Sequence, residues 1–158
     1  MATTTKKTAP PPPPPPQAAI SLEIRRTFAA PRERVFRAWT VPQELDKWSA
    51  PGPMTPTADV DLRVGGRYRI VMRGPDGTEH RVGGVYRVIE PPSRLVYTWK
   101  WEDKPGGGDT VVTVDFLERG KSTEVVLRHE GFDDAEDRAR HEHGWGACLD
   151  NLASFTSQ

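Results

Sequence analysis

The feature that most constrains this chain is a series of short stretches in which apolar and polar residues alternate, each closed by turn-forming residues. Alternation with a period of two is typical of a strand that buries one face. Glycine and proline at the breaks supply turn geometry or prevent continued pairing. Because the connections are short, the pattern predicts an antiparallel meander. The expected strands cover residues 68–73, 82–89, 95–101, 110–117 and 123–130, with a further short strand near 57–62.

A first strand and two short helices are expected before this meander. Ile20, Leu22 and Ile24 alternate with polar residues and indicate a strand at the start of the folded region. Pro31 and Pro42 then each open a helical segment, because proline is tolerated in the first turn of a helix. Apolar residues cluster on one side of each segment, which indicates two short helices packed against a core.

A long amphipathic helix is expected after the last strand. Asp133 and Glu136 have the spacing of a capping box, which satisfies free amides at a helix start. A single apolar stripe follows at steps of three and four residues. Its members are Trp145, Cys148, Leu149, Leu152 and Phe155. We therefore predict an α+β fold, in which a curved antiparallel sheet of about six or seven strands carries this helix on its concave face.

Several motifs, each weak alone, occur together in the order of one known family. They are APRERVFRAWT at 30–40, the segment 42–48, GGRY at 65–68, GVY at 84–86, IEPPSRLVYTW at 89–99 and the late Gly144-Trp145. Over residues 22–155 the chain resembles bacterial proteins grouped with the C-terminal domain of the heat-shock-protein-ninety ATPase activator. That family lies in the SRPBCC, or START-like, superfamily, so the resemblance implies the helix-grip fold. The superfamily includes lipid-transfer domains, hormone binders, polyketide cyclases and the chaperone activator, so fold alone leaves the function open.

The N-terminal segment differs from the rest of the chain in composition. Pro10 to Pro16 are consecutive prolines, which lack backbone donors and favour an extended polyproline helix. We therefore expect a disordered proline-rich tail at 1–18 and one helix-grip domain at 19–158. The tail is expected to act as a stiff spacer, the alternative being a ligand for an aromatic groove on a partner.

Charge and hydropathy exclude several classes of partner. The 22 basic residues balance 22 acidic ones, so no long-range field favours nucleic acid. The sequence has no run of 18 apolar residues, so we expect no membrane insertion and a cytoplasmic protein. The one cysteine, Cys148, cannot form an internal disulfide and is expected to be a buried, inert thiol.

Large aromatic residues on neighbouring strands predict a binding pocket for a small apolar molecule, either lipid-like or polycyclic. Tyr68, Ile70 and Met72 share one side of their strand, and Tyr97 and Trp99 share one side of another. Walls of this kind suit an apolar ligand with a few polar contacts. The alternative is that the same side chains fill a solid core. The candidate ligand-binding residues are Trp48, Tyr68, Ile70, Met72, Tyr86, Tyr97, Trp99, Trp145, Leu149 and Leu152.

Metal binding and catalysis have less support in the sequence than ligand binding. His141 and His143 lie two apart on a helix and point to opposite sides, so we expect no metal site there, and no cofactor motif is present. We assign no catalytic residue and expect binding rather than catalysis. Two alternatives remain open: contact with a chaperone, implied by the resemblance, and a cyclase-like enzyme in which His129, Glu130 and His143 act as acid or base.

Overall fold

The computed structural model describes residues 20–104 and 108–157 and contains seven strands and three helices. The expected tail at 1–18 lies outside the described residues, and the domain boundary there stays a prediction. No helix in the described part of the chain is long and apolar enough to cross a membrane. The elements in chain order are β1 (Ser21–Phe28), α2 (Arg32–Thr40), α3 (Pro42–Leu45), β2 (Thr55–Val60), β3 (Arg67–Arg73), β4 (Glu79–Glu90), β5 (Arg94–Trp101), β6 (Thr110–Arg119), β7 (Ser122–Glu130) and α4 (Ala135–Thr156).

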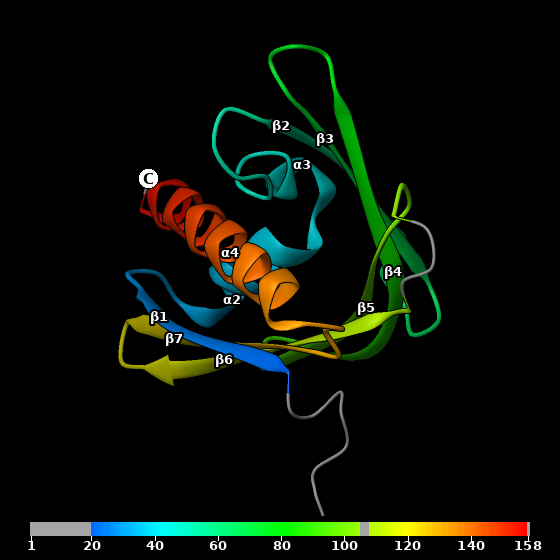
Figure 1. Ribbon diagram of the computed structural model, residues 1–158. Coiled ribbons are helices and arrows are strands. Elements are labelled where there is room, and N and C mark those ends of the chain that lie inside the picture. The colour runs from blue at the N-terminus through cyan, green and yellow to red at the C-terminus, as the bar shows by residue number, and fades with distance from the viewer. Residues whose placement is uncertain (1–19, 105–107, 158) are drawn as a thin grey trace, which may run out of the picture.

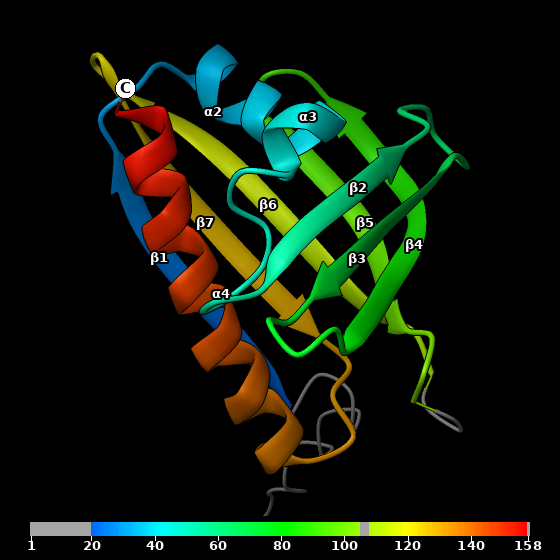
Figure 2. The same cartoon turned by 90° about the horizontal axis from the view of Figure 1, so that it is seen from above.

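All seven strands form one antiparallel sheet in the order β1-β7-β6-β5-β4-β3-β2. The meander from β2 to β7 follows the chain, as predicted, and β1 pairs with the last strand. In the chain, α2 and α3 lie between β1 and β2. These two strands are the opposite edges of the sheet. The sheet curves strongly and α4 lies in its hollow, with α2 and α3 covering one end (Figures 1 and 2). This arrangement confirms the predicted helix-grip fold.

Strand alternation determines which side chains face the hollow. On β3, Tyr68, Ile70 and Met72 are buried, whereas Arg67, Arg69 and Arg73 are exposed. Exposed arginines on the outer face pair with carboxylates on nearby strands, as Arg69 does with Glu102 at 2.8 Å. The apolar set therefore lines the concave face and the charged set meets solvent, as the alternation predicts.

The close approach of β4 to β5 depends on a position without a side chain. Gly84 falls between the inward-facing Val82 and Tyr86 on β4. A Cβ atom there would overlap with the Thr98 carbonyl oxygen and lie 2.6 Å from the Thr98 hydroxyl. The open space lets the Thr98 hydroxyl accept from Val85 N at 2.9 Å and lets the Tyr68 hydroxyl cross β4 to donate to the Thr98 carbonyl at 2.6 Å. Glycine is required because two strands approach each other so closely here.

The start of α4 corrects one sequence expectation. Asp134, not Asp133, is the N-cap, and its side chain accepts from Asp137 N at 2.7 Å. The two aspartates are adjacent, and each has an acidic residue three positions later. Spacing alone therefore cannot show which of them is the N-cap. The apolar stripe of α4 packs on the sheet as predicted. Its polar edge is held to β1, where Arg138 donates to the Ser21 carbonyl at 2.6 Å.

We predict that Gly84→Ala lowers the free energy of unfolding by roughly 1–3 kcal/mol, the usual cost of inserting atoms into a packed region. Urea denaturation followed by circular dichroism measures the change. Gly146→Ala is the matched control, because a Cβ on Gly146 meets nothing within 4 Å in the middle of α4. That control should stabilise the protein by roughly 0.5–1 kcal/mol. Equal stability of Gly84→Ala and the parent would contradict this account of the close contact between β4 and β5.

Candidate functional site

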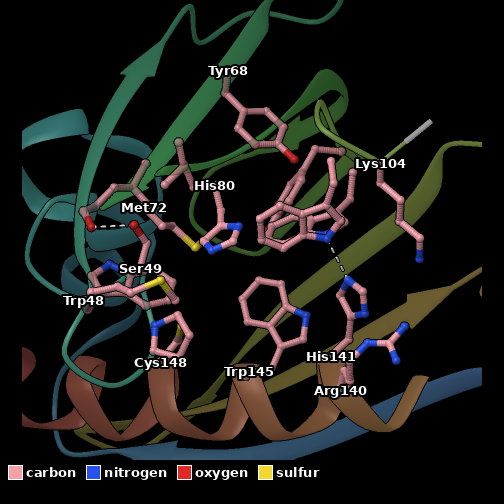
Figure 3. A pocket seen from close by; sticks show the side chains of 18 of the residues that line it. Trp48, Ser49, Tyr68, Met72, His80, Lys104, Arg140, His141, Trp145 and Cys148 are labelled. Atoms are coloured by element: carbon pink, nitrogen blue, oxygen red, sulfur yellow. Dashed lines mark hydrogen bonds between the residues drawn. The ribbon is translucent and has the colours of Figure 1, made fainter. Parts of the chain in front are cut away.

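A cavity of about 480 Å³ lies between the concave face of the sheet and α4. Its walls come from α2, α3 and the following loop, from β3 to β5, and from the first half of α4. In Figure 3, Tyr68 reaches in from the sheet while Trp145 and Cys148 project from α4 on the opposite side. The volume is within the range of small-molecule sites, roughly 300–1,000 Å³.

Aromatic residues are sorted by type between the cavity and the solid core. All five tryptophans and all three tyrosines of the chain line the cavity, whereas none of its five phenylalanines does. Four of the phenylalanines, Phe28, Phe36, Phe116 and Phe132, are buried in the core away from the cavity. The rings that carry a hydroxyl or an indole N–H therefore gather around the empty space. This is the composition expected of a wall that meets a ligand with some polar atoms.

The structure brings most of the predicted binding residues together on this wall. They are Trp48, Tyr68, Ile70, Met72, Tyr86, Tyr97, Trp99 and Trp145. Leu149 and Leu152 lie outside the lining and are fully buried in the apolar core. Binding by these residues stays a prediction. The candidate set omitted Trp39 and Trp101, although each shares a face with buried apolar residues, a signal that was visible in the sequence.

His129 sits at the centre of a hydrogen-bonded chain behind the wall. The ring is fully buried, and its Nδ1 accepts from the Trp145 indole at 3.1 Å. Its Nε2 lies 2.7 Å from the Thr110 hydroxyl, which donates to the Trp99 carbonyl at 3.0 Å. Because Nδ1 must accept, the proton of the neutral ring lies on Nε2 and points at Thr110. Both ring nitrogens are occupied, so the acid or base role considered for His129 has no free nitrogen to use.

Burial, together with a smaller effect of the neighbouring His141, lowers the pKa of His129 to about 2. A proton on Nδ1 would face the Trp145 N–H, which explains in atomic terms why the charged form is disfavoured. The imidazole therefore stays neutral and acts as a connector between α4 and the sheet.

His141, rather than His143, is the histidine of α4 that approaches His129. The two rings lie 5.2 Å apart between centroids, whereas His143 is exposed. His141 Nδ1 lies 2.8 Å from the Asp137 carbonyl, and its Nε2 accepts from the Trp101 indole at 3.0 Å (Figure 3). Burial lowers the pKa of His141, partly opposed by the bond to Asp137. The contact of His129 with His143 that the cyclase-like alternative requires is not found, because the phase of α4 turns His143 to solvent.

Charged side chains gather at one end of the cavity. Lys104 and Arg140 both contact the Asp137 carboxylate, at 3.2 and 3.0 Å, and His80 Nδ1 lies 3.7 Å from Asp103. Burial would raise the pKa of Asp137, but hydrogen bonds from Lys104 and Arg140 and the nearby His141 bring it below its usual value. Because Lys104 and Arg140 are exposed, the cavity meets solvent here.

Neither a metal-ligand cluster nor a reactive thiol is found in the described part of the chain. Among residues 20–104 and 108–157, no group of three or more His, Cys, Asp or Glu side chains is placed to hold a metal ion. Cys148 lines the cavity, and burial raises the pKa of its thiol to about 12. At neutral pH it is therefore a protonated, weakly polar part of the wall.

Comparison with known proteins identifies relatives in one family. A family model described as Activator of Hsp90 ATPase homolog 1-like protein matches residues 29–157. Human Activator of 90 kDa heat shock protein ATPase homolog 1 is 27% identical over 124 residues, which are 78% of this chain and 33% of the human protein. The mouse protein is 25% identical over the same length. The chain thus spans about a third of the length of these curated relatives.

Solved structures share the fold over nearly the whole described chain. A protein from Chromobacterium violaceum has a TM-score of 0.80 and 29% identity, covering 89% of this chain and 99% of that one. A protein from Silicibacter pomeroyi has a TM-score of 0.75 and 28% identity, covering 85% and 95%. These similarities establish the architecture and the family. The chemistry of the cavity depends on the residues of this chain that line it.

We predict that the stability of the protein falls as the pH drops from about 6.5 toward 5, partly through His129. An unfolded histidine binds a proton below about pH 6.5, whereas the folded ring stays neutral down to about pH 2. The unfolded state therefore gains protons first, and a single such group contributes a slope of about 1.4 kcal/mol per pH unit. Urea denaturation between pH 5 and 7 measures the slope.

In the same experiment His129→Gln should reduce the slope by about that amount, because the titrating group is gone. His143→Gln removes an exposed imidazole from α4 and serves as the control for the loss of a surface histidine. A slope in His129→Gln equal to that of the parent would show that His129 is not the buried neutral ring described above.

Proposed function

From the premise that this chain belongs to the family of Activator of Hsp90 ATPase homolog 1-like proteins, we propose that it binds a small apolar ring compound between its sheet and α4. The observation that carries the proposal is the sorting of aromatic residues: every tryptophan and tyrosine of the chain lines one cavity. Flat rings offer large apolar area at little cost in side-chain entropy, and they pair well with other rings. A polycyclic ligand therefore fits these walls better than a flexible acyl chain.

Desolvation supplies most of the expected affinity. Burying a few hundred square ångströms of apolar surface at about 25 cal/mol per Å² supports micromolar binding after ordering costs. The rings that line the cavity also contact one another, as Tyr68 and Tyr97 do at 5.2 Å and Trp99 and Trp145 do at 5.2 Å between centroids. Such contacts support a preformed site, which lowers the cost of ordering the wall on binding.

The two buried histidines and the thiol of the site support binding rather than catalysis. The nitrogens of His129 and His141 are used in bonds to protein groups, and the thiol of Cys148 is protonated at neutral pH. A nucleophile or general base requires a free, activated group within reach of the substrate. We therefore propose a carrier or sensor of small molecules.

We predict that the neutral fluorescent probe N-phenyl-1-naphthylamine binds with a Kd in the micromolar range. Gly144→Leu should weaken binding at least roughly tenfold, because Gly144 lines the cavity and has open space where a side chain would begin. Titration of probe fluorescence, and of the quenching of the tryptophans around the site, measures both affinities.

Gly146→Leu is the matched control, since Gly146 lies on the same helix, also has open space and does not line the cavity. It should bind the probe as the parent does. The proposal fails if the parent binds none of a broad panel of apolar ring compounds, or if Gly144→Leu binds as tightly as Gly146→Leu.

The family also supports a second candidate, contact with a chaperone ATPase of the Hsp90 type. Leu62 and Val64 support it from this chain, because they are large apolar side chains that are 43% and 64% exposed on the connection between β2 and β3. Large exposed apolar side chains of this kind can contribute to a contact with a partner protein. The activity itself stays a proposal, because the curated relatives are about three times longer than the matched region.

For this candidate we predict that the purified protein raises the ATP turnover of an Hsp90-type chaperone. The double variant Leu62→Ser, Val64→Ser should lose at least half of that effect, because its contact area would be less apolar. A phosphate-release assay measures turnover. Lys121→Ser, an exposed change on the β6–β7 hairpin, is the control. Turnover unchanged by the parent protein would remove the chaperone candidate and leave the ligand proposal untouched.

A further inference from the structure

The hydrogen bonds of the cavity wall leave a surplus of donors. Four of the five indole N–H groups are bonded to protein acceptors. The fifth, Trp99 Nε1, is buried and has no partner among the described residues. An indole N–H can only donate, so only an acceptor can satisfy it. Leaving a buried donor unpaired is costly in general, and a native structure retains few of them.

Two tyrosine hydroxyls of the cavity wall add to this surplus. The Tyr97 oxygen accepts from the Trp39 indole at 3.1 Å, so the Tyr97 proton needs a different acceptor. No acceptor for that proton, and no partner for the Tyr86 hydroxyl, is found among the described residues. Tyr68 differs, because its proton is used by the Thr98 carbonyl at 2.6 Å.

Tyr86 and Tyr97 form one patch of donors on the concave face, which we name the donor patch. Tyr97 faces inward on β5, and Tyr86 stands opposite it in the strand register. Trp99 Nε1 is not part of the patch, because its surroundings close this atom off from the cavity. The rings of Tyr86 and Tyr97 lie 6.1 Å apart between centroids. Burial raises the pKa of both tyrosines, so their hydroxyls remain protonated donors at neutral pH.

The cations of the site are not available to the donor patch. Lys104 and Arg140 line the open end of the cavity, and both are engaged by the Asp137 carboxylate. A ligand carboxylate placed at the donor patch would lose its hydration without gaining a counter-charge, which is strongly unfavourable. A neutral acceptor, such as a carbonyl oxygen, avoids that cost.

We propose that the ligand is a neutral ring compound that carries a carbonyl-type oxygen, and that this oxygen accepts hydrogen bonds from the donor patch. The inference rests on the proposed function, since it names the class of molecule that the same cavity takes. The apolar walls supply affinity for the ring system, and the donor patch selects which ring system binds and in which orientation.

A set of probes of nearly equal shape tests this inference. Fluorene carries no polar atom, 9-fluorenone adds a carbonyl at the same position, and fluorene-9-carboxylate adds an anion. Isothermal titration with the full chain should give a Kd for fluorenone about threefold to tenfold lower than that for fluorene, the usual gain from one net hydrogen bond. The carboxylate should bind more weakly than fluorene.

Tyr86→Phe is the informative variant, because it removes a donor without breaking a hydrogen bond within the protein. It should bring the fluorene-to-fluorenone ratio of Kd values toward one, and the infrared carbonyl band of bound fluorenone should move back toward its position in an apolar solvent. Tyr68→Phe is the matched control, since its hydroxyl proton is already used by Thr98. It should keep the parental ratio, even if it lowers the stability of the fold.

The outcomes separate this inference from the proposed function. Tight binding of fluorene and fluorenone with equal Kd values would overturn the carbonyl inference while the binding function stands. The same conclusion follows if fluorenone is preferred and Tyr86→Phe does not change the preference. Failure of the parent to bind either probe would overturn the inference together with the proposal that this cavity takes ring compounds.

Discussion

Hydrogen bonds to indole N–H groups hold this protein's interior open. The acceptors are the Tyr97 hydroxyl, the Ala38 carbonyl and ring nitrogens of His129 and His141. A tryptophan that swung inward to fill the space would leave its N–H unpaired, at a cost of roughly 1–3 kcal/mol. Phenylalanine has no such restraint, and the phenylalanines of this chain pack elsewhere. These four bonds thus restrain Trp39, Trp48, Trp101 and Trp145 in the wall of the cavity.

The same bonds join elements that are distant in the chain. The Trp145 indole connects α4 to His129 on β7, and from there the chain of bonds reaches Thr110 on β6 and the Trp99 carbonyl on β5. The helix is therefore positioned by one neutral imidazole as well as by its apolar stripe. A protonated His129 would oppose the Trp145 donor, so the acid stability of the fold and the geometry of the cavity depend on the same ring.

Local sequence patterns predicted the fold well. They failed where two neighbouring residues fitted the same pattern equally well. The alternation on β3 correctly separated Tyr68 from the exposed arginines, because a strand has a simple two-residue period. Spacing could not choose between Asp133 and Asp134 as the cap of α4, since each has an acid three residues later. It also could not assign the histidine that meets His129, because that depends on the rotation of α4 against the sheet.

By itself, the sequence determined the order of strands and helices and the face of each that is apolar, because those properties follow from backbone periods read within a few residues. It also predicted that tryptophan and tyrosine would line any interior space. Only the tertiary structure decided that this space is hollow, and that Leu149 and Leu152 belong to the solid core rather than to its wall. The reason is that the position of α4 depends on the bond from Trp145 to His129, and the shape of the concave wall on bonds such as that from Tyr68 to Thr98, whose partners lie 16 and 30 residues apart along the chain.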